Sequence, residues 1–272
     1  MSAEYSDQFN TIRCCYDSEM EIGRIVLNRP DSLNAMTGRT LDELSAAIEL
    51  FDEFDREGES VSVRAVILSG AGEDAFSVGV DIDEIGDEHY PFTASSFRRA
   101  LFSIEEYGAP VIAKIDGYCV GGGLELALMC DFRIASERSE LGFPEVELGI
   151  FPSGVGTTQR LPRLIGPSRA KKLCMTGKFL SGAEAANAGL IDDAYPVDVL
   201  ETEVTSYAEL LASKAPLAIR AIKDTINKSQ NMGLKQGTEY EYQAYLPLLH
   251  TADYEEGTAA FDEDRDPQWQ GR

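Results

Sequence analysis

The segment Val111–Asp131 restricts the fold of this chain more than any other feature. In it, an apolar strand runs into Gly121, Gly122 and Gly123 and then into a short apolar helix. Glycines at a strand-to-helix junction let backbone N–H groups approach a ligand closely. The first N–H groups of the helix lack partners within it, so they can bind an anion or a polarised carbonyl oxygen. Taken alone, the three glycines fit a tight turn equally well.

Strands and helices are expected to alternate around this segment, which predicts an α/β core. The apolar residues of the first long helix, Thr37–Phe54, have helical spacing, and Thr37 is its expected N-cap. The other expected helices are Phe92–Tyr107 and Leu124–Met129. The expected strands are Thr11–Tyr16, Arg24–Asn28, Ala65–Leu68, Val111–Ile115 and Phe132–Ala135.

The pattern changes after about Pro196, where only helices are expected. They cover Val199–Ala212, Pro216–Gln230, Leu234–Leu249 and Ala252–Asp264. The all-helical tail suggests a separate layer or an assembly surface. We therefore divide the chain into a core, residues 1–195, and a helical C-terminal region, residues 196–272.

Two glutamates are candidates for acid–base chemistry. Glu125 is the one charge in an apolar helix start, where burying a carboxylate is costly unless it has partners or a function. Glu145 follows Pro144, 20 positions later. Two carboxylates on one cleft can divide acid and base roles, since their surroundings can separate their pKa values. Spacing alone does not bring them together, and a solvated loop acid remains the alternative for Glu145. We interpret the neighbouring Glu147 as a surface residue.

A loop at Ala75–Ile85 holds a third candidate site. Gly79 permits an unusual backbone conformation and can present the N–H of Val80 to a ligand. An ordinary glycine in a surface loop explains the local sequence equally well.

Composition excludes several classes of protein. The chain has 47 acidic and 24 basic residues and a formal charge of −23, which argues against nucleic-acid binding. The two histidines and five cysteines lack metal-ligand spacing, so no metal site is expected. No apolar run is long enough for a membrane span, and the polar start has no signal-peptide pattern, so we expect a cytoplasmic protein.

An acidic excess of this size is also typical of halophilic proteins. Salt screens the repulsion within such a surface, so we expect thermal stability to rise with added KCl.

Seven motifs in order resemble the enoyl-CoA hydratase (crotonase) family, from about Thr11 to Trp269. They include the glycine segment, the Pro144-Glu145 pair and the loop around Gly79. The others are Leu27–Met36, Thr158–Arg163, Met175–Leu190 and Asp253–Arg265. The resemblance implies a spiral of ββα turns with a C-terminal helical trimerisation region, assembled as a homotrimer or a dimer of trimers. It assigns the active site to the core, residues 1–195, and oligomerisation to the helical region, residues 196–272.

The resemblance also implies a reaction and the residues that perform it. The N–H groups of Val80 and Gly122 would form an oxyanion hole for a thioester carbonyl. Glu125 and Glu145 would hold one water and add it across the double bond of a 2-enoyl-CoA, as in fatty-acid β-oxidation. Which glutamate supplies the proton stays open, because the two titrations are coupled. Coenzyme A would be part of the substrate, and no separate cofactor is expected.

Further positions that the resemblance assigns to acyl-CoA binding are Arg29, Asn34, Ala35, Gly79, Asp81, Ile82 and Gly121. The sequence departs from the family pattern at three places. Asp83 and Asp264 stand where many relatives have lysine, which would weaken phosphate contacts. The segment Pro152–Gln159 is one residue longer than the common pattern, which would alter the shape of the adjoining acyl pocket.

Other members of the crotonase family act on acyl-CoA as thioester hydrolases, decarboxylases or carbon–carbon lyases, and the Glu125/Glu145 pair argues against most of them. Two further alternatives to a hydratase remain. A Δ3-Δ2 enoyl-CoA isomerase on the same fold generally needs only the glutamate at the Glu145 position, so Glu125 favours hydration. A non-catalytic scaffold or RNA-binding member is the second, and both the paired glutamates and the acidic charge oppose it.

Overall fold

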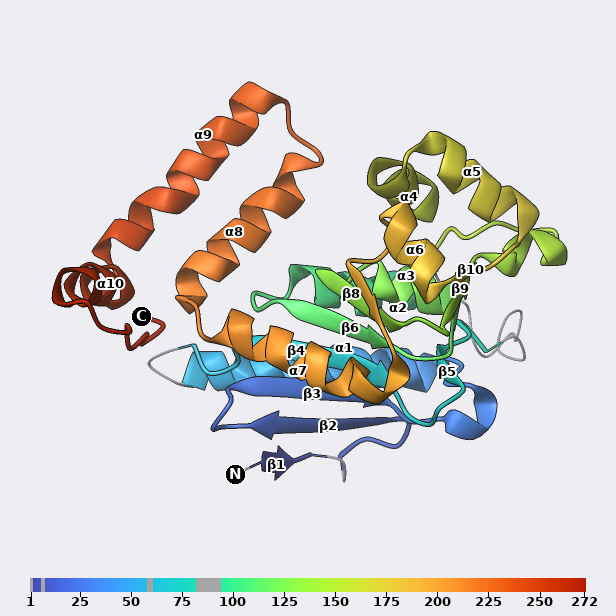
Figure 1. Ribbon diagram of the computed structural model, residues 1–272, viewed down its shortest axis with the longest axis horizontal. Coiled ribbons are helices and arrows are strands. Elements are labelled where there is room, and N and C mark those ends of the chain that lie inside the picture. The colour runs from blue at the N-terminus through green and yellow to red at the C-terminus, as the bar shows by residue number, and fades with distance from the viewer. Residues whose placement is uncertain (1, 6–7, 58–60, 82–93) are drawn as a thin grey trace.

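The larger of two sheets forms the centre of the fold (Figure 1). The structure is a computed structural model and describes residues 2–5, 8–57, 61–81 and 94–272. In the described chain this sheet has seven strands in the order β1-β2-β3-β4-β6-β8-β11. The first three pair antiparallel, and β3, β4, β6, β8 and β11 pair parallel. Their bounds are β1 Ser2–Glu4, β2 Ile12–Asp17, β3 Ile22–Leu27, β4 Ala65–Gly70, β6 Val111–Ile115, β8 Phe132–Ser136 and β11 Asp193–Tyr195.

Helices cover both faces of this sheet, which is why its central strands are apolar throughout. On β4, Val66 and Leu68 face the core cluster shared with α1 (Gly38–Glu57) and α2 (Ala94–Glu106), whereas Ala65 and Ile67 face the cluster shared with α7 (Val197–Ala212). The alternation follows from the two-residue period of a strand. The helix that opens the predicted oligomerisation region therefore packs on the main sheet.

The smaller sheet places the loops of the candidate site. Its order is β10-β9-β7-β5, and β5, β7 and β9 are parallel. The bounds are β5 Ala75–Ser77, β7 Tyr118–Val120, β9 Glu140–Gly142 and β10 Leu180–Ser181. Because the carboxyl ends of parallel strands lie at the same edge, the residues that follow these three strands meet there. They are Val78–Val80, Gly121–Gly123 and Phe143–Glu145.

Three helices that the sequence did not predict form a lobe beside the smaller sheet. They are α4 (Thr157–Ile165), α5 (Pro167–Thr176) and α6 (Gly182–Ala188). In the chain, the lobe comes after the short helix α3 (Gly122–Ala127). Two short 3-10 helices lie outside the lobe, namely η2 (Pro30–Ser32) and η4 (Pro144–Leu148). A capping box at Ser181 and Glu184 begins α6.

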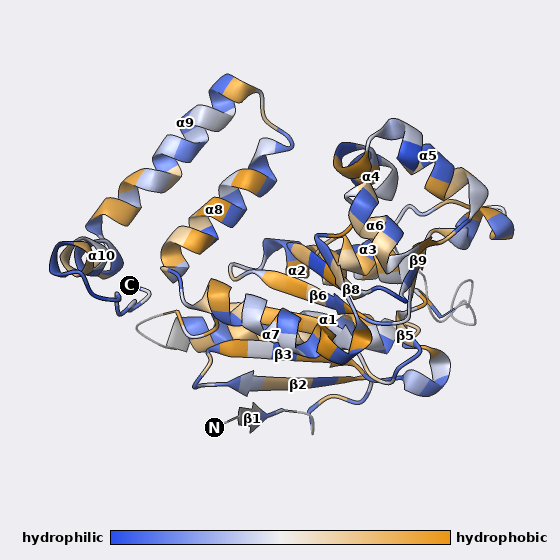
Figure 2. Cartoon of the chain, in the orientation of Figure 1, coloured by the Kyte–Doolittle hydropathy of each residue, from blue (hydrophilic) through white to orange (hydrophobic). Residues whose placement is uncertain are grey.

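The C-terminal helices extend away from the core (Figure 1). They are α8 (Pro216–Ser229), α9 (Leu234–Tyr245), η5 (Leu246–His250) and α10 (Ala252–Glu263). Apolar residues occur along α8 and α9 (Figure 2), and several are exposed. The exposed fraction of Leu234, on α9, is 89%, and that of Phe261, on α10, is 86%. Apolar surface of this kind on a protruding pair of helices is typical of an interface.

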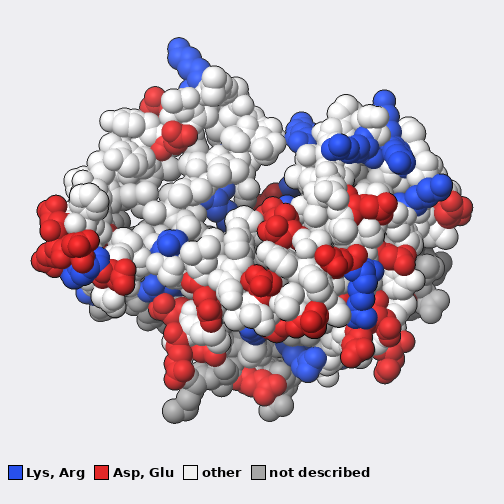
Figure 3. Space-filling model, viewed as in Figure 1, with Lys and Arg blue, Asp and Glu red and all other residues white. Residues whose placement is uncertain are grey.

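Charges are unevenly distributed over the surface. Asp and Glu predominate over much of the face in view, whereas Lys and Arg gather over α4 and α5 (Figure 3). The acidic excess of the sequence is therefore a property of the surface outside this lobe.

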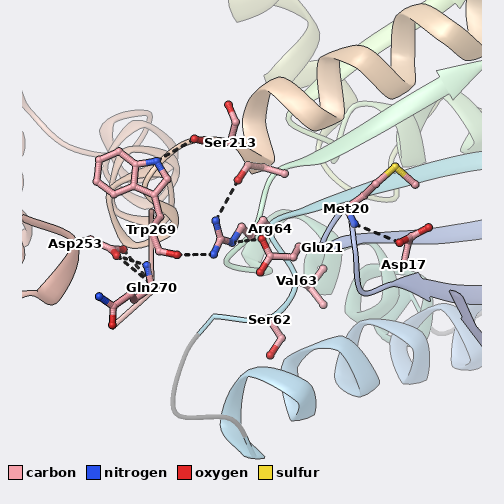
Figure 4. Close-up of polar contacts among 12 residues, drawn as sticks. Asp17, Met20, Glu21, Ser62, Val63, Arg64, Ser213, Asp253, Trp269 and Gln270 are labelled. Atoms are coloured by element: carbon pink, nitrogen blue, oxygen red, sulfur yellow. Dashed lines mark hydrogen bonds and ion pairs between the residues drawn. The ribbon is translucent and has the colours of Figure 1, made fainter. Parts of the chain in front are cut away.

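The C-terminal residues fix the protruding helices to the core (Figure 4). Arg64 donates from Nη2 to the carbonyl of Trp269 at 2.9 Å and lies 2.8 Å from the carboxylate of Glu21. The indole of Trp269 donates to the carbonyl of Ser213, and Asp253 accepts from the backbone N–H of Gln270. These contacts join α7, α10 and the start of β4.

Most predicted elements are confirmed within a few residues. The helix predicted at Thr37–Phe54 is α1, and the Thr37 hydroxyl accepts from the N–H of Thr40, as expected of an N-cap. The apolar residues predicted for its inner face are buried, namely Leu41, Leu44, Ala47, Ile48 and Phe51. The helix predicted from Leu124 begins two residues earlier, at Gly122, so part of the glycine segment is itself helical.

Other expectations concern membranes, metals and cysteines. Over the described residues, no helix is both long and apolar enough to cross a membrane, and no group of possible ligands could hold a metal ion. Cys14, Cys119 and Cys130 are buried, and Cys15 and Cys174 are partly buried. All five are free thiols.

Candidate active site

Two backbone N–H groups lie side by side where β5 and β7 end. A β-bridge joins Met36 to Val80: the Met36 N–H donates to the Gly79 carbonyl, and the Asp81 N–H donates to the Met36 carbonyl. This pattern leaves the Val80 N–H unused. A Cβ placed on Gly122 would lie 3.3 Å from the Val80 nitrogen. Neither the Val80 nor the Gly122 N–H donates to any residue of the described chain, so both can bind one oxygen.

Gly79 makes this approach possible. Its φ of +95° lies in the region that side chains disfavour, and a Cβ there would be 2.7 Å from the Gly122 nitrogen. Its N–H donates to the Ser77 hydroxyl at 3.1 Å, and that hydroxyl donates to the Asn34 carbonyl. Buried hydrogen bonds through the Ser77 hydroxyl therefore fix the loop that contains Gly79.

Glu125 is the buried acid of α3, with 4% of its surface exposed. Its Oε1 accepts from the Thr157 hydroxyl at 2.6 Å and from the Gly154 N–H at 3.0 Å. Burial raises the pKa of Glu125, and the hydrogen bonds from Thr157, Val155 and Gly154 oppose that rise. The donors favour the carboxylate form and fix its orientation.

Glu145 is the partly buried acid of η4. Burial, helped by the charge of Glu125, raises its pKa to about 7, against a smaller lowering by its own backbone N–H. Its Oε2 is buried and has no hydrogen-bond partner among the described residues. A buried oxygen without a partner is costly unless a proton, water or substrate satisfies it. Glu145 is thus suited to carry a proton near neutral pH.

The two glutamates meet beside the paired N–H groups. A Cβ on Gly121 would lie 3.0 Å from Oε1 of Glu145, and the Gly121 carbonyl accepts from the Glu125 N–H at 2.9 Å. The structure therefore brings together four of the residues singled out from the sequence: Val80, Gly122, Glu125 and Glu145. Such a site can polarise a carbonyl and move protons on the atoms beside it.

The positions assigned to CoA binding differ from one another in exposure and in hydrogen bonding. Arg29 donates to the Ala35 carbonyl and pairs with Asp81 at 3.0 Å, and 26% of its side chain is exposed. Asn34 is buried, and its amide donates to the carbonyls of Ala71 and Ala75. Asn34 thus holds the backbone of this region together from inside. Ile82 and Asp83 lie outside the described residues.

The sequence did not point to Thr157, Gly154 or Phe97 as part of the site. Phe97 is buried, and a Cβ on Gly154 would overlap its ring at 2.2 Å. The segment Pro152–Gln159 contains both Gly154 and Thr157. Its extra residue was noticed in the sequence, but its function as the donor loop for Glu125 is visible only in three dimensions.

Glu147 is exposed, as predicted. It lies on η4 two residues after Glu145. The 3-10 helix η4 therefore carries one acid that lies in the site, Glu145, and one that faces solvent, Glu147.

Comparisons with known proteins agree with this geometry. Residues 17–272 match the family model described as enoyl-CoA hydratase/isomerase. A probable mitochondrial enoyl-CoA hydratase of Dictyostelium discoideum is 38% identical over 92% of this chain and 88% of its own length. The crystal structure of an enoyl-CoA hydratase from Bacillus anthracis superposes with a TM-score of 0.89 at 39% identity, covering 97% of this chain and 100% of that one. One from Geobacillus kaustophilus has a TM-score of 0.91 at 31% identity, with both chains fully covered.

Proposed function

The chain belongs to the enoyl-CoA hydratase/isomerase family, and from that premise we propose that it adds water to a 2-enoyl-CoA, giving a 3-hydroxyacyl-CoA. The observation that carries this proposal is the pairing of the buried Glu125 with the partly buried Glu145 beside two unused backbone N–H groups. Names of relatives at 36–38% identity over at least 90% of this chain support the same reaction. The crotonase fold alone would support several acyl-CoA reactions.

The oxyanion hole would act on the thioester carbonyl. Attack on the β-carbon moves the π electrons of the double bond toward the α-carbon and the carbonyl oxygen, so negative charge develops on that oxygen. The N–H groups of Val80 and Gly122 are positioned to stabilise that charge without rearrangement. Fixed donors of this kind contribute about 10²–10³ in rate each.

The glutamates would divide the proton transfers. We assign the acid to Glu145, because its raised pKa and unpartnered Oε2 favour the protonated form. We assign the base to Glu125, because three donors favour its carboxylate. Water gives a proton to Glu125 and its hydroxyl to the β-carbon, while Glu145 gives its proton to the α-carbon. The pair holds one proton before and after the reaction, and no further cofactor is needed.

The protruding helices support the proposed assembly as a homotrimer or a dimer of trimers. Ile222 and Ile226 of α8 and Tyr242 and Tyr245 of α9 are exposed, and exposed apolar surface of this kind is typical of a protein–protein interface. The acyl-CoA is the proposed small-molecule partner. The cytoplasmic location and the halophilic interpretation of the composition remain predictions.

Crotonyl-CoA distinguishes hydration from isomerisation. We expect the protein to consume it and to form 3-hydroxybutyryl-CoA, measured as loss of the conjugated thioester absorbance in high KCl. An isomerase would leave crotonyl-CoA unchanged and convert a 3-enoyl-CoA instead. That outcome would overturn the proposed reaction, and Glu125 would then have no part in the chemistry. A protein that binds the thioester but converts neither compound would be a scaffold.

Thr157→Val is expected to move the acid limb of the pH–rate profile. Because the active pair holds one proton, kcat/KM should be bell-shaped and should fall above about pH 7, as Glu145 ionises. The hydroxyl of Thr157 lowers the pKa of Glu125, so its removal lets Glu125 protonate at higher pH. The acid limb should therefore shift upward, while the basic limb shifts less.

Thr158→Val is the matched control, because Thr158 is an exposed neighbour whose hydroxyl only accepts from Gln159. The pH profile of this variant should coincide with that of the wild type. A Thr157→Val enzyme that loses activity equally at all pH values would show that Thr157 supports only the structure.

A further inference from the structure

One stretch of this acidic chain contains no acidic residue at all. Between Glu147 and Glu184 there are six cations, and all 47 acidic residues of the protein lie outside this stretch. The six are Arg160, Arg163, Arg169, Lys171, Lys172 and Lys178. The stretch forms α4, α5 and β10, and its cations make the blue surface over α4 and α5 (Figure 3). A local reversal of charge on so acidic a surface attracts anions to this lobe.

A cavity of about 150 Å³ lies within the same lobe. Three of the cations line it, namely Arg169, Lys172 and Lys178. Its remaining lining is mostly apolar and comes from Ile165, Leu173, Thr176, Leu180 and Ala188. Arg169 is held at the edge by a hydrogen bond from Nη1 to the Ala188 carbonyl at 3.2 Å. The cavity thus joins a cationic rim to an apolar floor.

The cations on the rim retain unused charge. Within the described parts of the chain, neither Arg169 nor Lys172 nor Lys178 forms an ion pair. Glu184 is an acid near Lys172. The pKa of Glu184 is lowered first by hydrogen bonds from Ser181 and to a smaller extent by the charge of Lys172. Glu184 Oε2 is already engaged by the N–H and hydroxyl of Ser181. An incoming anion would therefore be the first full partner of these three groups.

This cavity is separate from the paired glutamates. Cys174 lies on α5, which packs against η4, the element that carries Glu145. Its pKa is raised to about 11 by burial first and then by the charges of Glu145 and Glu125, as expected of a thiol near the paired glutamates. Leu173, the preceding residue, lines the cavity. Successive residues of a helix point about 100° apart, so the two sites lie on different faces of α5.

We propose that the cavity between α5, α6 and β10 binds a small organic anion with a compact apolar part, such as a six-carbon carboxylate. The head group faces Arg169, Lys172 and Lys178, and the apolar part contacts Ile165, Leu173 and Leu180. A cavity of this volume is large enough for a molecule the size of benzene. The inference does not depend on the reaction proposed above.

Hexanoate is the probe, and calorimetric titration measures its affinity for the full-length protein. Lys172→Gln should weaken binding by about fivefold or more, because one of the three cations that line the cavity around the head group is lost. Lys171→Gln is the matched control: Lys171 is the exposed neighbour and does not line the cavity. Its affinity should stay within about twofold of wild type, and both variants should keep the wild-type circular dichroism spectrum.

Two other probes separate the parts of the site. Inorganic phosphate, which lacks the apolar part, and 1-hexanol, which lacks the charge, should each bind at least about fivefold more weakly than hexanoate. Hexanoate should bind equally well to protein saturated with acetyl-CoA. Competition with acetyl-CoA would place hexanoate in the acyl site and overturn the proposal. Equal losses in Lys171→Gln and Lys172→Gln would also overturn it, because they would indicate only a diffuse basic surface.

Discussion

Glu145→Gln is expected to lose at least about two orders of magnitude in kcat/KM for crotonyl-CoA. Glutamine preserves the size of the side chain and its capacity for hydrogen bonds, but it cannot supply a proton to the α-carbon. The wild-type carboxyl can carry a proton near neutral pH because burial raises its pKa to about 7. Glu125→Gln should lose a comparable factor, because the water would lack its base. The measurement is steady-state hydration at several substrate concentrations, with kcat and KM determined separately.

Glu147→Gln is the matched control for this result. It makes the same substitution two residues further along η4, on a side chain that is exposed. Its kcat/KM should remain within about twofold of wild type, as is usual for surface substitutions. If Glu145→Gln kept more than about a tenth of the wild-type activity, proton transfer by Glu145 would be excluded. If Glu125→Gln alone stayed active on a 3-enoyl-CoA, the reaction would be isomerisation.

The parts of the site that the sequence predicted were those with strong local constraints. The glycine segment is constrained locally: Gly121 has a positive φ of 54°, and a Cβ on Gly123 would lie 2.2 Å from the Ser77 carbonyl oxygen. Glu125 was conspicuous as one charge among apolar residues. Glu145 was not, because nothing near it distinguishes a buried loop acid from a solvated one. Only the parallel register of β5, β7 and β9 brings Glu145 to the glycine segment, and register is a long-range property.

The lobe of α4, α5 and α6 could not be predicted by periodicity. These helices are short, and α4 contains Pro162, which sequence reasoning treats as a helix breaker. Strands of two or three residues, such as β9 and β10, are too short to show a two-residue alternation. The capping box at Ser181 was a local feature that could have identified the start of α6.

The assignment of Asn34 to CoA binding stays a prediction, but its side chain shows a different limit of sequence reasoning. Its place in a motif near the presumed CoA site suggested ligand contact, and its left-handed φ of 56° is compatible with a turn. The structure shows that its amide is occupied by the carbonyls of Ala71 and Ala75. Side-chain polarity alone cannot distinguish a ligand contact from an internal hydrogen bond, because both use the same atoms.

Gly79→Ala is expected to lower kcat by about 10²–10³, since it disrupts the oxyanion hole rather than the acids. The new methyl group would lie 2.7 Å from the Gly122 nitrogen, a separation at which one of the two backbone segments must move. Either movement separates the Val80 and Gly122 N–H groups that must bind one oxygen. The pH limits of the profile should stay unchanged, because Glu125 and Glu145 keep their surroundings.

Gly189→Ala separates this effect from backbone strain. Gly189 has a similar left-handed φ of +76°, and nothing lies within 4 Å of a Cβ at that position. Gly189→Ala should lose roughly 1–2 kcal/mol of stability in thermal unfolding through its left-handed φ alone. Gly79→Ala should lose more, because its methyl group also overlaps the Gly122 nitrogen, but only Gly79→Ala should lose the larger part of kcat. Val80→Ala should retain kcat within about threefold, because its backbone supplies the donor. If Val80→Ala were as inactive as Gly79→Ala, the Val80 side chain would be the essential group and the backbone oxyanion hole would be excluded.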